Sequence, residues 1–495
     1  MSPSASSRFA RLRGLAVASI VCLGAGCSLA LSAADRASGA GKVPEGDWPT
    51  WGYNAARSGV GPSDTGITAA NLHALKRTTV DIDQVVDAAP IELHAASMAG
   101  RRRDVILVTT IYGQTIAIDA SSGRKLWEYA PPDYRELLDS PQVTTTTPVA
   151  DPDRKYVYAA SPDGYVQKLA LSSGRSVWRT RVTFDPTREK LDGALNIGDR
   201  ALLVVLGGYF GDAPVYQGHV AELNLATGRI MHVFNSLCSN IHRLIDPPKR
   251  CGASDSAIWG RGGTIVEQDG DILVATGNAP FNGRTDWGDS VLELSPTLRL
   301  LHNWTPINQA QLNSGDIDLG STEPGLLPGG RGPRLAVQGG KDGILRLLDL
   351  DRLDGSGGPA GPRTGGELQQ IDAPGPAQIF SQPAVWRRDG RTFVFVTDSA
   401  GTAGYTVSGG RLHAAWSDST PGTSPVVAGG LLYVFDMQHG VLNVRNPVTG
   451  DVDTALRAGP GHWNSPIVVG GRIILTDGDY MSPGPSNIFI YHLPR

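Results

Sequence analysis

Short runs of alternating apolar and polar residues recur along most of the chain, each preceded by a glycine. One such unit reads Gly113-Gln-Thr-Ile-Ala-Ile-Asp119-Ala-Ser-Ser-Gly123 and continues to Trp127. Related units occupy residues 164–178, 218–228 and 440–450. Alternation in runs rich in β-branched residues predicts strands rather than helices. Each polar piece between two runs predicts a hairpin loop whose glycine accepts a positive φ.

The recurrence of these units predicts the fold class. A supersecondary unit that returns every ~35–70 residues indicates a repeat protein, and we expect an all-β propeller. Counting the degenerate copies gives about eight blades of four antiparallel strands, or seven if the terminal pieces combine differently. The tryptophan that ends a unit should pack against the next one. A propeller closes by pairing its ends, and Asp47-Trp-Pro-Thr-Trp51 is the expected closing piece.

The first 34 residues predict an export signal. Three arginines, Arg8, Arg11 and Arg13, precede an apolar stretch over 15–23 that is too short to span a membrane. We therefore expect a periplasmic or secreted protein, with a flexible linker over 35–46 and a single propeller domain over 47–495.

Two processing routes for this signal stay open. The segment that ends in Cys27 resembles the lipobox of bacterial lipoproteins, although its leucine lies four residues before the cysteine instead of three. The Ser-Ala-Ala stretch at 32–34 suits an ordinary signal peptidase. Membrane contact is expected only if Cys27 is lipidated.

Charge and cysteine content narrow the function classes. The formal net charge is −4 and the chain has no basic stripe, so nucleic-acid binding is not expected. Beyond the leader, Cys238 and Cys251 form an even pair, which in an oxidising compartment predicts a disulfide, with two unrelated buried thiols as the alternative. The chain has no Cys-x-x-Cys-His motif, so we expect no covalently bound c-type haem.

The stretch from about 209 to 341 breaks the blade rhythm with longer connections, where binding and catalytic residues concentrate. Four positions in it follow one another as Trp259-Gly260, Thr276-Gly-Asn278, Ile317-Asp318 and Lys341-Asp-Gly. In order and approximate spacing, they resemble the cofactor region of the dehydrogenases that depend on pyrroloquinoline quinone (PQQ). These are eight-bladed periplasmic quinoproteins that oxidise alcohols.

The resemblance implies a role for each position. Asp318 would be the general base and a Ca²⁺ ligand, Asn278 a second ligand, and Asp212 a third in the place of the family's glutamate. Trp259 would support the flat quinone, and Lys341 would stabilise negative charge on its oxygens. The expected substrate is an alcohol or a polyol, and a separate cytochrome c or quinone would accept the electrons.

Departures from the family keep other hypotheses open. The family's adjacent cysteine pair is absent, and Asp212 is shorter than glutamate. The polyvinyl-alcohol dehydrogenase branch is one nearer candidate. A non-catalytic propeller, like the lipoprotein scaffold that assists outer-membrane β-barrel assembly, is the alternative from another class. Each site residue also has a structural explanation: Trp259 as blade packing, and Asn278, Asp318 and Lys341 as turn or cap residues.

Overall fold

The computed structural model describes residues 43–138, 140–329, 332–353, 364–482 and 484–494. Residues 38–495 form one compact unit. The expected export signal, its cleavage sites and most of the expected linker lie outside the described residues. Within the described ranges, every helix is too short or too polar to traverse a lipid bilayer.

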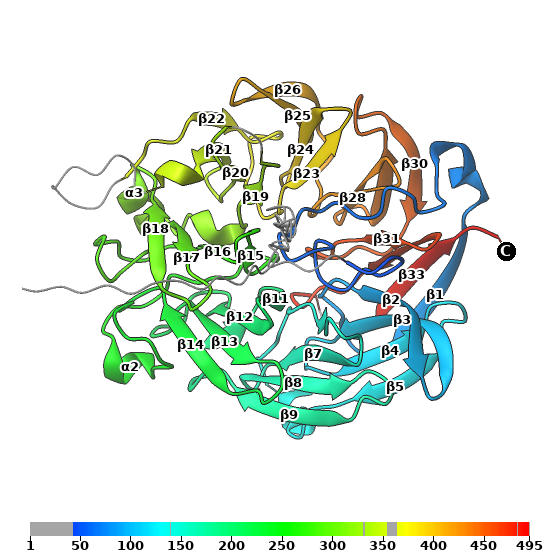
Figure 1. Cartoon of the computed structure of the whole chain (residues 1–495), viewed down its shortest axis with the longest axis horizontal. Coiled ribbons are helices and arrows are strands. Elements are labelled where there is room, and N and C mark those ends of the chain that lie inside the picture. Colours follow the sequence, from blue (N-terminus) through cyan, green and yellow to red (C-terminus); the bar gives the residue numbers. More distant parts are fainter. Residues whose placement is uncertain (1–42, 139, 330–331, 354–363, 483, 495) are drawn as a thin grey trace, which may run out of the picture. The chain divides into compact units, whose positions relative to one another are not determined.

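Eight antiparallel sheets stand around a common centre, which confirms the predicted eight-bladed propeller (Figure 1). The first blade comprises β2 (Ile91–Met98), β3 (Arg101–Thr109), β4 (Thr115–Asp119) and β5 (Lys125–Tyr129), and the second comprises β6 (Val149–Ala150), β7 (Tyr156–Ser161), β8 (Tyr165–Ala170) and β9 (Ser176–Arg181). The third blade comprises β10 (Glu189–Leu191), β11 (Asn196–Gly198), β12 (Ala201–Gly208), β13 (His219–Asn224) and β14 (Ile230–Asn235). The fourth blade comprises β15 (Ile265–Val266), β16 (Ile272–Ala275), β17 (Val291–Leu294) and β18 (Leu300–Trp304).

The fifth blade comprises β19 (Gly325–Leu326), β20 (Leu335–Gln338), β21 (Ile344–Asp349) and β22 (Gln369–Asp372), and the sixth comprises β23 (Ala384–Arg388), β24 (Arg391–Thr397), β25 (Thr402–Ser408) and β26 (Arg411–Asp418). The seventh blade comprises β27 (Val426–Ala428), β28 (Leu431–Asp436), β29 (Val441–Arg445) and β30 (Val452–Arg457). The eighth blade comprises β31 (Ile467–Val469), β32 (Arg472–Thr476), β33 (Ser486–His492) and β1 (Lys76–Ile82). The short helices in the connections are α1 (Tyr134–Leu138), α2 (Pro247–Arg250), α3 (Gln309–Ser314) and the 3-10 turns Ala69–Ala74, Leu319–Ser321 and Leu350–Arg352.

The tryptophans that end the repeat units lock neighbouring blades together, as predicted. Trp127 lies under the hairpin glycine of the next blade, where a Cβ on Gly174 would come within 2.5 Å of the indole. Its Nε1 also donates to the carbonyl of Leu171 at 2.7 Å. Trp178 and Trp416 repeat both contacts at later blade boundaries. These glycines are required because a side chain would collide with the indole.

Ring closure joins the two ends of the propeller, but the predicted closing piece was wrong. Strand β1 pairs with β33 and completes the last blade, with Lys76 opposite His492. The 47–51 segment instead lies at the ring centre, where Trp48 bridges Glu92 of β2. The physical reason is polarity. Strand β1 is largely exposed and suits an outer edge, whereas Trp48 is fully buried and needs an apolar interior.

One blade departs from four strands. In the third blade the inner position is divided between β10 and β11, which both pair with β12. The interruption falls at 192–195, where the backbone turns toward the next blade and Ala194 N–H donates to the carbonyl of Arg261 at 3.0 Å. Gly193 permits this approach, because a Cβ there would lie 2.7 Å from Gly263 Cα.

The segment 47–62 runs along the first strands of several blades and fixes the turn that precedes β15. Its Arg57 is completely buried and donates to the carbonyls of Trp51 at 2.7 Å and Gly262 at 2.9 Å. Glu323, also buried, accepts from the N–H groups of Gly262 and Gly263. Backbone groups buried in the ring centre are thereby satisfied, and the residues just before this turn are held in place.

Two kinds of connection meet on one face of the ring. In every blade the first strand is innermost and its neighbours are antiparallel, as Figure 1 shows. The link that enters a first strand therefore lies at the same end as the link between the second and third strands. We call this end the mouth face.

Candidate functional site

All the predicted site residues lie in links of the mouth face. Trp259 and Asp318 lie in the links that enter β15 and β19. Asn278, Lys341 and Asp212 lie in the links between second and third strands of three consecutive blades. Residues that are separated by up to 129 positions in the sequence are thus placed at one end of the ring.

Lys341 connects the predicted base to the predicted aromatic platform. Its ammonium group forms an ion pair with Asp318 Oδ2 and lies 3.6 Å from Asp316 Oδ1. The same Nζ atom lies 5.4 Å from the centre of the Trp259 ring. The Lys341 N–H also donates to the Asp318 carbonyl at 2.9 Å. Trp259, Asp318 and Lys341 therefore form one assembly; with Asn278 and Asp316 we call it the Asp318 cluster.

The link that carries Asn278 holds the other oxygen of Asp318. The backbone N–H of Asn278 donates to Asp318 Oδ1 at 2.7 Å. This approach requires glycine at 277, where a Cβ would lie 2.3 Å from that oxygen. Asn278 is 8% exposed, yet its side-chain amide forms no hydrogen bond to any described residue. A nearly buried amide without a protein partner is available to a ligand.

The electrostatic environment keeps Asp318 a better proton acceptor than an ordinary aspartate. Burial raises the pKa of Asp318, and Lys341 offsets this only in part, while Asp316 raises it further. Burial alone would lower the pKa of Lys341, but its attraction to Asp318 outweighs that effect and raises it. The Asp318 carboxylate is thus paired with Lys341 through Oδ2 and accepts one backbone hydrogen bond through Oδ1.

Asp212 approaches this assembly without touching Asp318. Its Oδ1 accepts a hydrogen bond from the Tyr216 hydroxyl at 2.7 Å. Burial raises its pKa, as do the negative charges of Asp316 and Asp255, whereas Lys341 lowers it. These influences place Asp212 within electrostatic range of the cluster. The second carboxylate oxygen of Asp212 accepts no hydrogen bond from any described residue.

Asp255 is an acidic residue of this site that the sequence did not reveal. Asp255 and Ser256 both adopt left-handed backbone conformations, with φ of 86° and 61°. Their N–H groups bond to the carbonyls of Tyr216 at 3.0 Å and Asn278 at 2.9 Å. The pair thus ties together the links that carry Asp212 and Asn278. Two consecutive non-glycine residues in this conformation carry strain that the surroundings must hold.

The predicted disulfide is confirmed and precedes this strained pair. Cys238 and Cys251 are bonded across a sequence separation of 13. The loop that they close contains α2 and leads directly into the segment with Asp255 and Trp259. Cross-linking so short a loop limits the freedom of the segment that follows.

A second cluster on the mouth face was not predicted. Among the described residues, one group of three His, Cys, Asp or Glu side chains places a ligand atom of each within 4.8 Å of the others, namely Asp87, His462 and Asp479. Asp212, Asp255 and Asp318 do not form such a group. A cation held by the predicted ligands would therefore need their side chains to turn toward one another.

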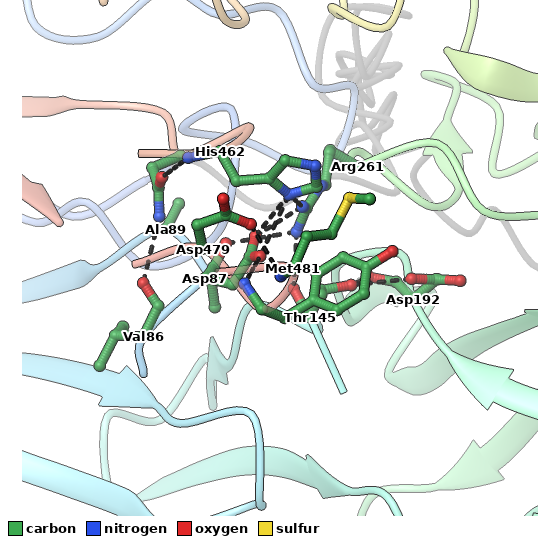
Figure 2. Close-up of polar contacts among 12 residues, drawn as sticks. Val86, Asp87, Ala89, Thr145, Asp192, Arg261, His462, Asp479 and Met481 are labelled. Atoms are coloured by element: carbon green, nitrogen blue, oxygen red, sulfur yellow. Dashed lines mark hydrogen bonds and ion pairs between the residues drawn. The ribbon is translucent and has the colours of Figure 1, made fainter. Parts of the chain in front are cut away.

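Arg261 supplies the positive charge of this second cluster (Figure 2). Its Nη2 lies 2.6 Å from Asp87 Oδ1 and 2.8 Å from His462 Nδ1, and Tyr480 N–H donates to Asp87 Oδ2 at 2.9 Å. Burial would raise the pKa of Asp87, but Arg261 and then His462 outweigh it and lower the pKa to about 2. We call Asp87, Arg261, His462 and Asp479 the Asp87 cluster. Because the Arg261 guanidinium lies at the centre of this cluster, we assign no metal to it.

Aromatic rings connect the two clusters. Trp259 lies two residues before Arg261, and its ring centre is 6.0 Å from that of Phe380. Phe380 lies 4.8 Å from Trp463, the neighbour of His462. Both clusters therefore border one channel mouth.

Comparison with solved structures identifies the architecture. Quinohemoprotein alcohol dehydrogenase from Comamonas testosteroni superposes with a TM-score of 0.65 at 15% identity, over 90% of this chain and 80% of that one. A europium-containing methanol dehydrogenase superposes with a TM-score of 0.67 at 15% identity, over 90% and 98%. The fold is that of the quinoprotein alcohol dehydrogenases. The resemblance seen in the sequence is confirmed at this level.

Sequence comparisons point to two kinds of propeller. A family model described as outer membrane protein assembly factor BamB matches residues 70–232 and 103–276. The dehydrogenase subunit of the quinone alcohol dehydrogenase of Acetobacter aceti is 24% identical over 295 residues, which is 54% of this chain. That match spans 37% of the relative's own length. None of these similarities assigns a role to an individual residue.

Proposed function

We propose that this protein is an exported oxidoreductase that oxidises an alcohol or a polyol at the Asp318 cluster, with PQQ and a cation such as Ca²⁺. One observation carries the proposal most directly: Lys341 lies between the Asp318 carboxylate and the face of Trp259. A buried base, a neighbouring positive charge and an aromatic ring at one channel mouth are parts that hydride removal from an alcohol uses.

The oxygen donors of the site suit a hard cation. Asp212 and Asp318 offer carboxylate oxygens and Asn278 an amide oxygen, which are the ligand types that Ca²⁺ prefers. Asp316 adds a carboxylate 3.6 Å from the Lys341 ammonium, and Asp255 lies close enough for Asp316 and Asp318 to raise its pKa, after burial. This excess of negative charge, together with the unpaired Asn278 amide, favours a bound cation at this position.

Each residue has a distinct part in the proposed reaction. When bound, PQQ supplies the two-electron acceptor for the hydride. Asp318 takes the proton of the alcohol hydroxyl, which its raised pKa favours. Lys341 neutralises negative charge that develops beside it, and Trp259 provides a flat apolar surface. The strained Asp255–Ser256 pair keeps the Asp212 and Asn278 links at a fixed separation.

The proposal extends to the protein's partners and location. We propose a periplasmic or secreted location, because the first 34 residues have the pattern of an export signal. Since the chain has no Cys-x-x-Cys-His motif, electrons would leave to a separate cytochrome c or quinone. Europium in one structural neighbour makes a lanthanide a second cation to be tested beside Ca²⁺.

A second candidate function is favoured by one observation. The match of residues 70–276 to the family named for an outer-membrane assembly factor suits a non-catalytic scaffold. Such a scaffold has no need for a buried acidic cluster, whereas a dehydrogenase does. Cofactor binding therefore separates the two hypotheses.

Tryptophan fluorescence tests the proposal. Adding PQQ and Ca²⁺ to the purified protein should quench the emission saturably, and Trp259→Phe should lose most of that quenching. Trp386→Phe, a packing tryptophan of another blade, is the matched control and should keep it. Reduction of an artificial dye on addition of an alcohol should accompany binding. Unchanged fluorescence in the unmodified protein would contradict the proposal and favour the scaffold.

A further inference from the structure

An uncharged aromatic cavity opens on the mouth face. Its volume is about 340 Å³, and its walls include Tyr112, Val143, Tyr209, Phe210 and Tyr480. None of its lining residues is charged. A cavity of about 570 Å³ at the first blade is lined instead by Arg102, Arg103, Arg124 and Lys125 among others. The aromatic cavity therefore suits a neutral and largely apolar ligand.

The walls of this cavity come from the same kinds of link as the candidate site. Tyr112 and Tyr480 lie between the second and third strands of their blades, and Val143 lies in the link that enters β6. Tyr209 and Phe210 begin the link that also carries Asp212, two residues beyond Phe210. Two residues span at most about 7 Å of chain. One wall of the cavity thus lies within about 7 Å of chain from Asp212, one of the proposed cation ligands.

Tyr480 joins the cavity to the channel mouth. Its ring centre lies 5.3 Å from that of His462, and its N–H donates to Asp87. The Lys190 ammonium lies 4.3 Å from the same ring and 2.7 Å from Asp192 Oδ1. Because Lys190 and Arg261 are both paired with carboxylates, no cation among these neighbours is free to attract an anionic ligand.

The rim of the cavity exposes apolar side chains that pack in no core. Phe210 is 83% exposed, and Met481, next to Tyr480, is 53% exposed. Tyr209 is anchored instead, since its hydroxyl donates to the Pro186 carbonyl at 3.2 Å. Exposed apolar side chains that are grouped around a cavity mark a binding site. The lining therefore combines an anchored tyrosine with an exposed phenylalanine.

We propose that this cavity binds the aliphatic tail of the alcohol substrate, so that the protein acts on long-chain primary alcohols. This inference rests on the proposed function, because it assumes that the hydroxyl end lies at Asp318. The uncharged lining excludes a charged head group.

Chain-length dependence tests the inference. With protein loaded with PQQ and Ca²⁺, kcat/KM should rise by up to about fourfold per added methylene along the series from ethanol to 1-decanol. Phe210→Ser should reduce the preference for 1-octanol over ethanol by about tenfold. Val448→Ser is the matched control, since Val448 is 42% exposed in a hairpin far from the mouth face. The control should keep the full preference.

Binding is measured separately from turnover by saturation-transfer NMR with 1-octanol and the protein without cofactor. Transfer to the methyl end should be strong and should weaken in Phe210→Ser but not in Val448→Ser. Equal chain-length dependence in both variants would overturn the inference. So would a Phe210→Ser defect confined to reduction of a protein electron acceptor, which would make the surface a partner site. Octanol binding without oxidation of any alcohol would contradict the proposed function and leave the tail site standing.

Discussion

Two buried carboxylates face the same channel mouth, and their surroundings change their acidities in opposite directions. Asp87 is paired with Arg261 and His462 and accepts the Tyr480 N–H, so its pKa falls to about 2 despite complete burial. Asp318 has one ammonium partner and one backbone donor, and Asp316 repels its charge, so burial prevails and its pKa rises. Burial alone therefore does not decide what a carboxylate does.

The positively charged side chain that pairs with each carboxylate also differs between the two clusters. The Arg261 guanidinium bonds to Asp87, His462 and backbone carbonyls together, which fixes it in place. Lys341 is a compact charge on a flexible stem, and a ligand displaces such a group more easily than a forked guanidinium. We infer that the Asp87 cluster is an anchor that holds the mouth face together, and that the Asp318 cluster is left adaptable for chemistry.

The largest expected effect separates the clusters by activity. Asp318→Asn should lower dye-coupled alcohol oxidation by about 10³-fold, because the amide cannot accept the hydroxyl proton. PQQ-dependent quenching and the urea midpoint should change little, since the amide keeps the shape of the side chain. Activity within tenfold of the unmodified protein would show that Asp318 is not the base.

The free energy of unfolding should separate the two clusters in the opposite sense, with the larger loss at Asp87. Asp87→Ala leaves Arg261 without its carboxylate in a buried position, which costs about 3 kcal/mol of unfolding free energy. Asp318→Ala should cost clearly less, because Lys341 retains Asp316 as a partner. Urea unfolding with an unchanged m-value measures both. Equal losses would mean that both clusters are structural anchors.

The sequence predicted more of the fold than of the mouth face, for physical reasons. The hairpin glycines and the tryptophans are local signals, and each indicates a strand boundary or a blade contact within a few residues. Asp87, Arg261 and His462 come from distant links, and no local pattern announces that they meet. Asp255 was missed because its importance lies in a left-handed backbone, which an aspartate in a loop does not reveal.

The four-position resemblance located the Asp318 cluster because the order of links around a propeller follows the order of the sequence. Trp259, Asn278, Asp318 and Lys341 fall in successive links of neighbouring blades, so proximity follows from the repeat. The ion pair between Asp318 and Lys341 could not be predicted in this way, since it depends on side-chain direction. The roles of these residues remain predictions for the experiments described above.

A smaller effect tests how tightly the Asp318 cluster is packed. Gly277→Ala would place a methyl group against Asp318 Oδ1 and should lower activity by about 10- to 100-fold by displacing the carboxylate. Gly252→Ala is the control, because nothing lies within 4 Å of a Cβ at that position, directly after the disulfide loop. Steady-state kinetics of both variants measure the effect. Full activity in Gly277→Ala would show that the carboxylate tolerates a shifted position.

The smallest effect is the part of the pH dependence of stability that Asp87 contributes. The pKa of Asp87 is about 2 in the folded protein, against an ordinary value of 3.8. Its contribution is therefore fully present above about pH 5 and is lost progressively as the pH falls through the folded pKa, and it amounts to about 2 kcal/mol. Urea unfolding of the unmodified protein and of Asp87→Asn, measured between pH 6 and pH 2.5, should show the two free energies converging as the solution becomes acidic. Asp349→Asn, which removes a half-buried capping carboxylate, serves as the control and should run parallel to the unmodified protein. A constant difference between the unmodified protein and Asp87→Asn across this range would show that Asp87 is not held as a charged anchor, and the contrast with Asp318 would then lose its basis.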